Sequence, residues 1–230
     1  MESSSTILIT GGAGFIGSRY ARMIAEDHPD WSIRVLDLLT YSGTMTNLEG
    51  LEESLTFFRG DIADPEAVDE AMQGCEAVVN FAAESHVDRS LVDSHPFQHT
   101  NVEGVQVLLD AAIHHGVRRF LHVSTDEVYG TLSTEASSSR ESDQLNPSSP
   151  YAASKAAAEH LVSVAHRTHG LHTLMTRGSN TYGPHQYPEK IIPLFVTNAL
   201  EDRVMPVYGD GSAVRDYLHV DDHCRGIDLI

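Results

Sequence analysis

The chain has 230 residues, of which 41% are hydrophobic, and this is enough for one domain with a substantial core. Its formal net charge of −18 at pH 7 disfavours nucleic acid and anionic membranes as partners, because their phosphates would be repelled. The apolar runs are too short for a transmembrane helix and no signal-peptide pattern is found, so we expect a cytoplasmic protein.

Cysteine and lysine are rare in this composition. Cys75 and Cys224 lie far apart and outside any metal-ligand spacing, so we expect two free thiols and no zinc site. The 14 histidines have no convergent spacing either, and we assign no metal. The only lysines, Lys155 and Lys190, both fall in segments that carry motifs. An acidic chain with so few lysines is explained equally by a coding bias toward arginine and by a salt-adapted host.

The N-terminal half alternates short apolar or β-branched runs with helical stretches. Strands separated by helices pair in parallel through right-handed crossovers, so we predict a Rossmann-type, doubly wound α/β sheet. The predicted strands are 6–10, 33–37, 55–59, 77–81 and 119–124, and the predicted helices are about 15–27, 65–73 and 96–115.

A polar loop over 133–149 separates this half from a helix at 151–168 and a sixth strand at 173–177. Beyond it the pattern loosens around three prolines and a Gly-Asp-Gly turn. We therefore predict a dinucleotide-binding domain over 1–180 and the start of a smaller substrate lobe over 181–230. The sequence stops at Ile230 within the expected first turns of a helix, so we expect this lobe to be incomplete.

Three glycines, Gly11, Gly14 and Gly17, follow the first strand and open the first helix. Glycines there give a tight turn, admit a pyrophosphate and let the helix pack on the strand. The helix N-terminus adds free N–H groups and the positive end of a dipole. The pattern predicts dinucleotide binding; the alternative is a glycine turn without a ligand.

Asp37 ends the second strand, where its carboxylate can accept hydrogen bonds from both ribose hydroxyls and would repel a 2′-phosphate. This favours NAD over NADP, although Arg34 nearby leaves the choice open. Asp61 and Ile62 end the third strand and are predicted to meet the adenine; the alternative for Asp61 is that it opens a turn or caps the next helix.

Tyr151 and Lys155 stand four residues apart and share one face of a helix. An ammonium beside the phenol, reinforced by the positively charged nicotinamide ring, would lower the pKa of the phenol toward the working range of a base. Thr125, Asp126 and Glu127 follow the fifth strand at the edge where open α/β sheets bind ligands. Adjacent carboxyls there can act as an acid and a base; the alternative is a solvated pair that caps a turn.

The motifs GGAGFIGS, FAAESHVDRS, STDEVYG, YAASK, NTYGPHQYPEKIIP and YGDGSAVRDYLHVDDH resemble the extended short-chain dehydrogenase/reductase family, whose members are NAD-dependent epimerases and dehydratases. Within it, the likeness is to the dehydratases that act on dTDP-glucose. Related epimerases carry a small uncharged residue where Asp126 stands. The resemblance thus implies an NAD-containing hydro-lyase of nucleotide-sugar metabolism.

By this resemblance, Tyr151 takes the proton from the C4 hydroxyl while Thr125 hydrogen-bonds that hydroxyl, and hydride passes to NAD. Glu127 then removes the C5 proton, Asp126 protonates the leaving C6 hydroxyl, and the hydride returns to C6. Because one NAD serves the whole cycle, we expect it to be retained tightly.

The resemblance also assigns binding residues and a homodimer formed by the helices at 96–115 and 151–168. Gly178, Thr181 and Ala213 depart from the family pattern, and Thr181 puts one cofactor contact in doubt. The implied cofactor contacts are Gly11, Gly14, Phe15, Ile16, Gly17, Asp37, Leu38, Leu39, Thr40, Asp61, Ile62, Ala82, Ala83, Ser85, Thr100, Tyr151, Lys155 and Thr181. The implied substrate contacts are Ser85, Thr125, Asn180, Lys190, Ile191, Ile192, Pro206, Tyr208 and Arg215.

Two alternatives remain at this stage: the same reaction on UDP-glucose, and an NAD-binding module without catalysis.

Overall fold

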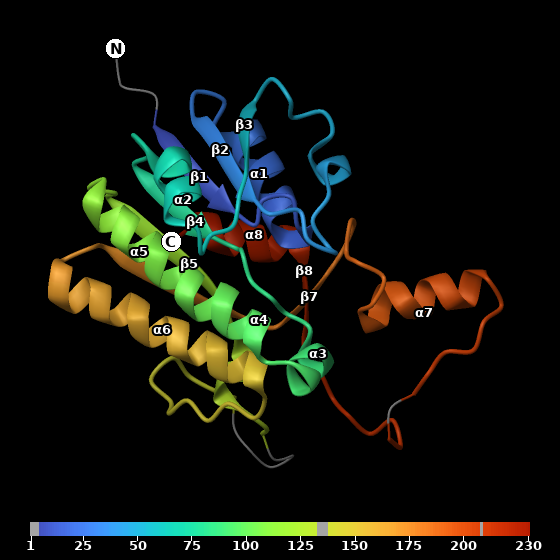
Figure 1. Cartoon of the computed structure of the whole chain (residues 1–230). Coiled ribbons are helices and arrows are strands. Elements are labelled where there is room, and N and C mark those ends of the chain that lie inside the picture. The colour runs from blue at the N-terminus through green and yellow to red at the C-terminus, as the bar shows by residue number, and fades with distance from the viewer. Residues whose placement is uncertain (1–4, 133–137, 208) are drawn as a thin grey trace.

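The computed structural model describes residues 5–132, 138–207 and 209–230. Its centre is a parallel sheet of six strands in the order β3-β2-β1-β4-β5-β6 (Figure 1). The predicted doubly wound fold is confirmed, and the strand order reverses between β1 and β4, where such sheets bind ligands. The strands are β1 (Thr6–Thr10), β2 (Ser32–Asp37), β3 (Leu55–Arg59), β4 (Ala77–Asn80), β5 (Arg119–Thr125) and β6 (Thr173–Gly178).

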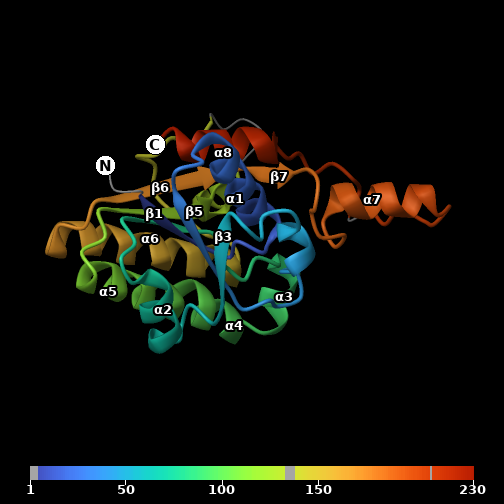
Figure 2. The ribbon, with the colours of Figure 1, turned by 90° about the horizontal axis from the view of Figure 1, so that it is seen from above.

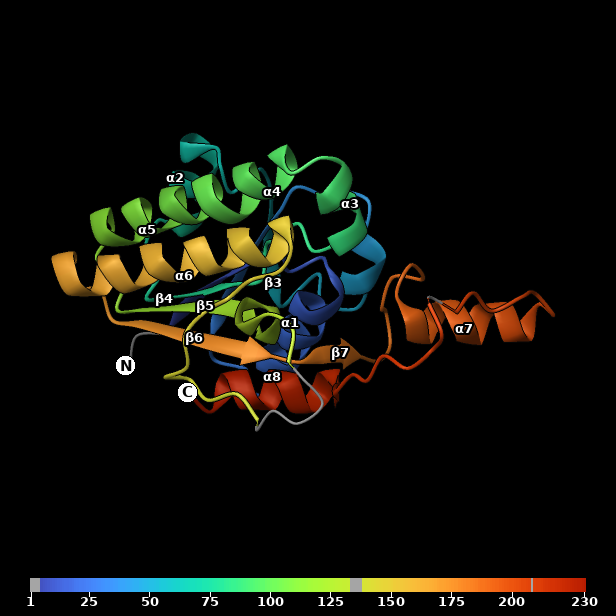
Figure 3. The same ribbon diagram turned by 90° about the horizontal axis from the view of Figure 1, so that it is seen from below.

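Helices cover both faces of this sheet: α1 and α8 lie on one face, and α2, α5 and α6 lie on the other (Figures 2 and 3). Successive residues of a strand serve opposite faces. In β1, Leu8 packs toward α2, α5 and α6, whereas Ile7 and Ile9 pack toward α1 and α8. Two covered faces explain why the strands are apolar almost throughout. The helices are α1 (Phe15–Asp27), α2 (Pro65–Met72), α5 (Val105–His114), α6 (Pro150–His169) and α8 (Val220–Asp228).

The helix predicted over 96–115 is interrupted. It begins as α4 (His95–Gln98), passes through a π-helical turn at His99–Gly104 and continues as α5. The turn directs Asn101 inward, where its amide donates to Ser154 Oγ and to the Glu84 carbonyl, each at 2.9 Å. A short helix that was not predicted, α3 (Val87–Val92), precedes it.

The segment after β6 first leaves the domain and then returns to it. β7 (Asn180–Tyr182) pairs in parallel with β8 (Tyr217–His219), and α7 (Ile191–Leu200) projects away from the body between them (Figure 1). The final helix, α8, packs on α1 through the buried Val220, Cys224 and Ile227. The division into domains at residue 180 stays a prediction.

Parts of two predictions fall outside the described residues: positions 133–137 of the polar loop, and Tyr208. The rest of that loop, 138–149, has neither helix nor strand. Within the described part of the chain, every helix is too short or too polar to cross a membrane.

Candidate active site

A cavity of about 1070 Å³ opens at the carboxyl ends of the strands. It brings together the glycine turn, the ends of β2 to β6, the start of α6 and the segment from β7 to β8. With Leu39 and Tyr208 excepted, every predicted catalytic, cofactor and substrate residue lines it. Leu39 instead packs against the core beneath α1. Residues that were predicted separately, from motifs far apart in the sequence, therefore line one cavity.

The glycine turn has the geometry that a pyrophosphate requires. Gly11 has a φ of +67°, and a Cβ there would lie 2.6 Å from the Ala82 nitrogen, so only glycine fits. A Cβ at Gly17 would collide with the Gly11 carbonyl, which keeps the helix close to the strand. Helix α1 begins at Phe15 without a side-chain cap, so its N-terminus faces the cavity ready for an anion.

Asp37 is fixed by backbone donors at the end of β2. Its Oδ2 accepts from the Ala13 N–H at 2.9 Å and its Oδ1 from the Leu39 N–H at 2.8 Å. Each carboxylate oxygen keeps a further lone pair for a ribose hydroxyl. Burial raises the pKa of Asp37, and the two backbone donors oppose that rise.

Arg34 and Asp61 were the two ambiguous residues of this half. The Arg34 guanidinium donates to the carbonyls of Ala71 and Gln73, at 3.0 and 2.7 Å, and lies outside the cavity, so it offers nothing to a 2′-phosphate there. Asp61 lines the cavity and also opens a turn, since its Oδ1 accepts from the Ala63 N–H at 2.9 Å, whereas the cap of α2 is Asp64.

Thr125 organises the catalytic segment after β5. Its hydroxyl accepts from the Glu127 N–H at 3.2 Å and caps a short 3-10 turn, Asp126–Tyr129, which presents Asp126 and Glu127 to the cavity. Burial raises the pKa of both carboxyls, and the charge of Asp126 raises that of Glu127 further. A solvated pair of capping acids is therefore not what is found.

Tyr151 and Lys155 both enter the cavity from the first turns of α6. The helix begins at Pro150, and its N-cap Ser149 accepts from the Ala152 N–H at 3.1 Å. Both side chains are buried, Tyr151 being 8% and Lys155 3% exposed.

The chain alone does not lower the Tyr151 pKa, and the lowering with the nicotinamide ring in place stays a prediction. Burial raises that pKa, the nearby charge of Glu127 raises it further, and a hydrogen bond with Thr125 only partly opposes the rise. Burial also lowers the pKa of Lys155, to about 8. Its Nζ donates to the Val123 carbonyl at 2.8 Å and lies 3.3 Å from His122 Nε2.

The predicted nucleotide-binding cations lie across the cavity from the glycine turn. Lys190 Nζ donates to the Ser85 carbonyl at 3.2 Å. The charges of Lys190 and Arg215 lower the pKa of Glu127, opposing the effect of burial. These cations thus act electrostatically on Glu127.

Sequence reasoning missed a cluster around Glu189. This carboxylate accepts from the Tyr41 hydroxyl at 3.2 Å and from Arg89 at 3.4 Å, and it lies 3.5 Å from His86 Nε2. Tyr41, Glu189 and the neighbouring Tyr187 line the cavity. The motifs around His86 and Glu189 were noticed separately, but no local pattern shows that they pair.

The two departures from the family pattern on β6 and β7 share one neighbour, His223 of α8. A Cβ at Gly178 would lie 2.6 Å from the His223 ring, and Thr181 Oγ1 lies 2.8 Å from its Nδ1. The ring therefore occupies the space that a larger residue at 178 would need. His223 also lines the cavity, which the sequence did not predict.

Within the described residues, one group could offer three metal ligands that lie within 4.8 Å of one another: Asp69, His114 and His115. It lies on α2 and at the end of α5, away from the cavity. His115 Nε2 is already engaged with Asp69 Oδ1 at 2.7 Å.

Comparisons with known proteins agree with this geometry. The sequence model of the NAD-dependent epimerase/dehydratase family matches residues 7–230. The chain is 55% identical to a dTDP-glucose 4,6-dehydratase of Streptomyces antibioticus, over 97% of this chain and 68% of that protein. A second dTDP-glucose 4,6-dehydratase, from an Actinoplanes species, is 51% identical over 97% of this chain and 71% of its own length.

Among solved structures, the dTDP-glucose 4,6-dehydratase DesIV of Streptomyces venezuelae, with NAD and dTDP bound, matches with a TM-score of 0.93 and 50% identity. That match covers 97% of this chain and 71% of DesIV.

Proposed function

Because the chain belongs to the NAD-dependent epimerase/dehydratase family, we propose that it holds NAD and dehydrates dTDP-glucose to dTDP-4-keto-6-deoxyglucose. The observation that carries this proposal is the half-buried pair Asp126 and Glu127 in one cavity with Tyr151 and Lys155. An epimerase has no need of an acid and a base at neighbouring sugar carbons, whereas loss of water requires both.

The residues of the chain divide the proton transfers among them. The hydrogen bond from Thr125 stabilises the phenolate of Tyr151, which takes the C4 hydroxyl proton and becomes the phenol. NAD bound in the cavity would supply the store for the hydride that leaves C4 and is returned to C6. The ketone at C4 acidifies the C5 proton, which Glu127 removes, and Asp126 protonates the C6 hydroxyl, which departs as water. Glu127 returns its proton to C5 as C6 is reduced, which completes the 4-keto-6-deoxy product.

The two carboxyls have different charged neighbours. Burial raises the pKa of both, and the charge of Asp126 raises that of Glu127 further, whereas Lys190 and Arg215 lower it. A coupled pair of carboxyls in one site is the usual basis for an acid and a base. The role of each is the one implied by the family resemblance.

Binding follows the two sides of the cavity. The glycine turn with Phe15 and Ile16 holds the pyrophosphate of NAD, and Asp37 holds the adenosine ribose. Lys190 and Arg215 contact the diphosphate of the substrate, where cations are favoured. The remaining contacts are those predicted from the family: Leu38, Leu39, Thr40, Asp61, Ile62, Ala82, Ala83, Ser85, Thr100, Asn180, Thr181, Ile191, Ile192, Pro206 and Tyr208.

The test is to incubate the purified chain with dTDP-glucose and with UDP-glucose and to follow the 4-keto-6-deoxy products by mass spectrometry. We expect conversion of dTDP-glucose. Preferential conversion of UDP-glucose would correct the substrate, and protein that holds NAD but converts neither sugar would overturn the proposal.

Asp126→Asn tests the acid role. The amide keeps the shape of the side chain but has no acidic proton, so water loss should slow about 100-fold or more while oxidation at C4 continues. Asp222→Asn, at an exposed position on α8, is the matched control. Equal slowing of oxidation and water loss in the Asp126 variant would contradict the assignment.

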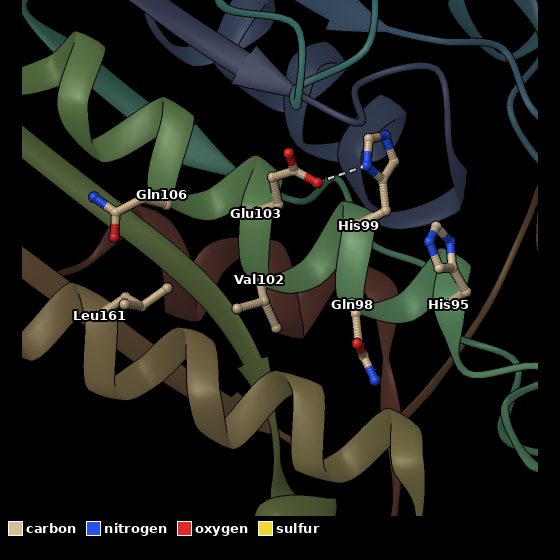
Figure 4. A pocket seen from close by; sticks show the side chains of 7 residues that line it. All are labelled: His95, Gln98, His99, Val102, Glu103, Gln106 and Leu161. Carbon is tan, nitrogen blue, oxygen red and sulfur yellow. Dashed lines mark hydrogen bonds and ion pairs between the residues drawn. The ribbon is translucent and has the colours of Figure 1, made fainter.

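We also propose a homodimer formed through the outer face of α4, α5 and α6. This face has a hollow between the continuous helical stretch from α4 to α5 and helix α6, and Val102 and Leu161 lie in it (Figure 4). Val164 on α6 is exposed beside it. The hollow is lined by His95, Gln98, His99, Val102, Glu103, Gln106 and Leu161.

Light scattering after size-exclusion chromatography tests this pairing. Leu161→Arg should give a monomer, whereas Leu200→Arg on the projecting α7 should leave the dimer intact. A monomeric parent chain would refute the proposal. The cytoplasmic location stays a prediction.

A further inference from the structure

A buried line of polar side chains runs beneath the cavity from the glycine turn to Lys155. Thr10, Asn80 and His122 stand directly opposite one another on β1, β4 and β5, because the registers pair Thr10 with Asn80 and Asn80 with His122. Thr10 Oγ1 lies 2.6 Å from Asn80 Oδ1, Asn80 Nδ2 lies 3.1 Å from His122 Nδ1, and His122 Nε2 lies 3.3 Å from Lys155 Nζ. All four residues are at most 3% exposed.

The distances favour one arrangement of protons. A separation of 2.6 Å suits an O–H···O bond better than an N–H···O bond, so Thr10 donates to the Asn80 oxygen. The Asn80 amide then donates to His122 Nδ1, and a neutral ring with a bare Nδ1 carries its proton on Nε2. This N–H points at Lys155, whose nitrogen can accept it only as a neutral amine.

A second arrangement exchanges the oxygen and nitrogen of the Asn80 amide and lengthens the Thr10 contact from 2.6 Å to the range of an N–H···O bond. If the Asn80 amide turns over, its NH₂ donates to Thr10 and its oxygen accepts a proton from His122 Nδ1. His122 Nε2 is then bare and accepts from the Lys155 ammonium. The line therefore satisfies its hydrogen bonds whether Lys155 is charged or neutral, and His122 is neutral in both cases.

We propose that His122 is a positioning residue whose tautomer is set by its hydrogen bonds through Asn80 to Thr10. It lets Lys155 change between ammonium and amine while Tyr151 gives up and recovers its proton. This inference rests on the proposed function for the timing of the exchange. The exchange itself is a property of the four buried side chains.

The other charged groups around Lys155 are compatible with its change between ammonium and amine. Glu159, one turn further along α6, raises the pKa of Lys155, but it is itself paired with Arg177 of β6 at 2.6 Å. Tyr151, on the preceding turn of α6, faces Glu127 and Asp126 at the end of β5. Burial lowers the pKa of Lys155 to about 8 and keeps His122 uncharged by lowering its pKa, so both forms of the lysine are accessible.

The test uses the presence of only two lysines in the chain. In full-length protein labelled with ¹⁵N-lysine and ¹⁵N-histidine, Lys155 and Lys190 give two Nζ signals, and the His122 ring is identified by its proximity to the Lys155 amine. We expect the His122 proton to move from Nδ1 to Nε2 as pH rises, with the same midpoint as the Lys155 titration. A ring that keeps one tautomer while Lys155 titrates would overturn the inference.

Asn80→Asp provides a second measurement. A carboxylate only accepts, so it holds the proton on His122 Nδ1 and favours the Lys155 ammonium. The Lys155 midpoint should rise by about one pH unit or more, and the pH at which oxidation at C4 is half-maximal should rise with it. Asn198→Asp, also at a buried asparagine but on α7, is the control that leaves both midpoints unchanged.

These outcomes separate the two proposals. Coupled titration in a chain that converts no sugar would keep the inference and refute the proposed function. Turnover without coupled titration would refute the inference alone.

Discussion

Removing Arg177 should destabilise the protein far more than removing an exposed arginine. Arg177 lies on β6, and its guanidinium makes three bonds to the Glu159 carboxylate on α6, the shortest being 2.6 Å. It also donates to the Tyr129 hydroxyl at 2.7 Å and to the Glu141 carbonyl at 3.0 Å. The side chain of Glu159 is only 3% exposed, so water cannot replace the lost partner.

The expected cost of Arg177→Met is about 3–5 kcal/mol, the range for leaving a buried charge uncompensated. Replacing both partners removes that charge, so Arg177→Met with Glu159→Met should cost less than Arg177→Met alone. The control is Arg118→Met, because Arg118 pairs with Glu76 at 3.2 Å while 79% exposed, and such a pair contributes about 0–1 kcal/mol.

The assay is unfolding in urea at pH 7, with the free energy taken from the midpoint and slope. Two results would refute the reasoning: a loss in Arg177→Met as small as that in Arg118→Met, or a double variant whose loss equals the sum of the single losses. A structural consequence is also measurable. Since Tyr129 closes the turn that presents Asp126 and Glu127, the surviving fraction of Arg177→Met should lose water from the substrate more slowly.

Three further predictions concern the cavity. Gly178→Ala should cost about 1–3 kcal/mol in urea unfolding through its clash with His223, and much less in a His223→Ala background; equal costs in both would contradict the clash. The unfolding free energy of the parent should rise between pH 8 and 10.5, because in this pH range the folded lysine has lost a proton that the unfolded lysine keeps. Lys155→Met should abolish this rise; an unchanged slope in the variant would show that Lys155 is not its source. Arg215→Leu should raise the pH midpoint of water loss, because Arg215 lowers the pKa of Glu127; an unmoved midpoint would show that the two do not interact.

The sheet was predictable because its signals are local. Each strand is a short apolar run, and each connecting helix has its own boundary residues, such as Pro65 for α2 and Pro150 for α6. Parallel pairing then places every strand end at one edge, which is why Asp37, Asp126 and Tyr151 meet. The one predicted helix that was interrupted hides a π-helical turn, whose extra residue leaves no mark in the apolar periodicity.

What could not be predicted depends on contacts between distant residues. Glu189 meets Tyr41 and Arg89 across 148 and 100 residues of chain. Burial raises the Tyr151 pKa in the chain alone, and this could not be predicted because spacing on a helix gives the distance to Lys155 but not the burial of both groups. The amine is directed to Val123 and His122, and those partners follow from the packing of α6 on β5.

The ionisable groups of the cavity share one tendency, which bears on how the reaction can run. Burial favours the neutral form of Asp126, Glu127 and Tyr151, and it favours the neutral amine of Lys155 as well. Such a site disfavours charge on its acids and on its lysine. The proton-accepting carboxylate form of Glu127 is then favoured by the cations of the segment after β6, which also bind the diphosphate in the proposed complex. Substrate binding and proton removal would therefore draw on the same charges: a bound diphosphate that neutralises Lys190 and Arg215 raises the pKa of Glu127, so its carboxylate holds a captured proton more firmly but forms less readily.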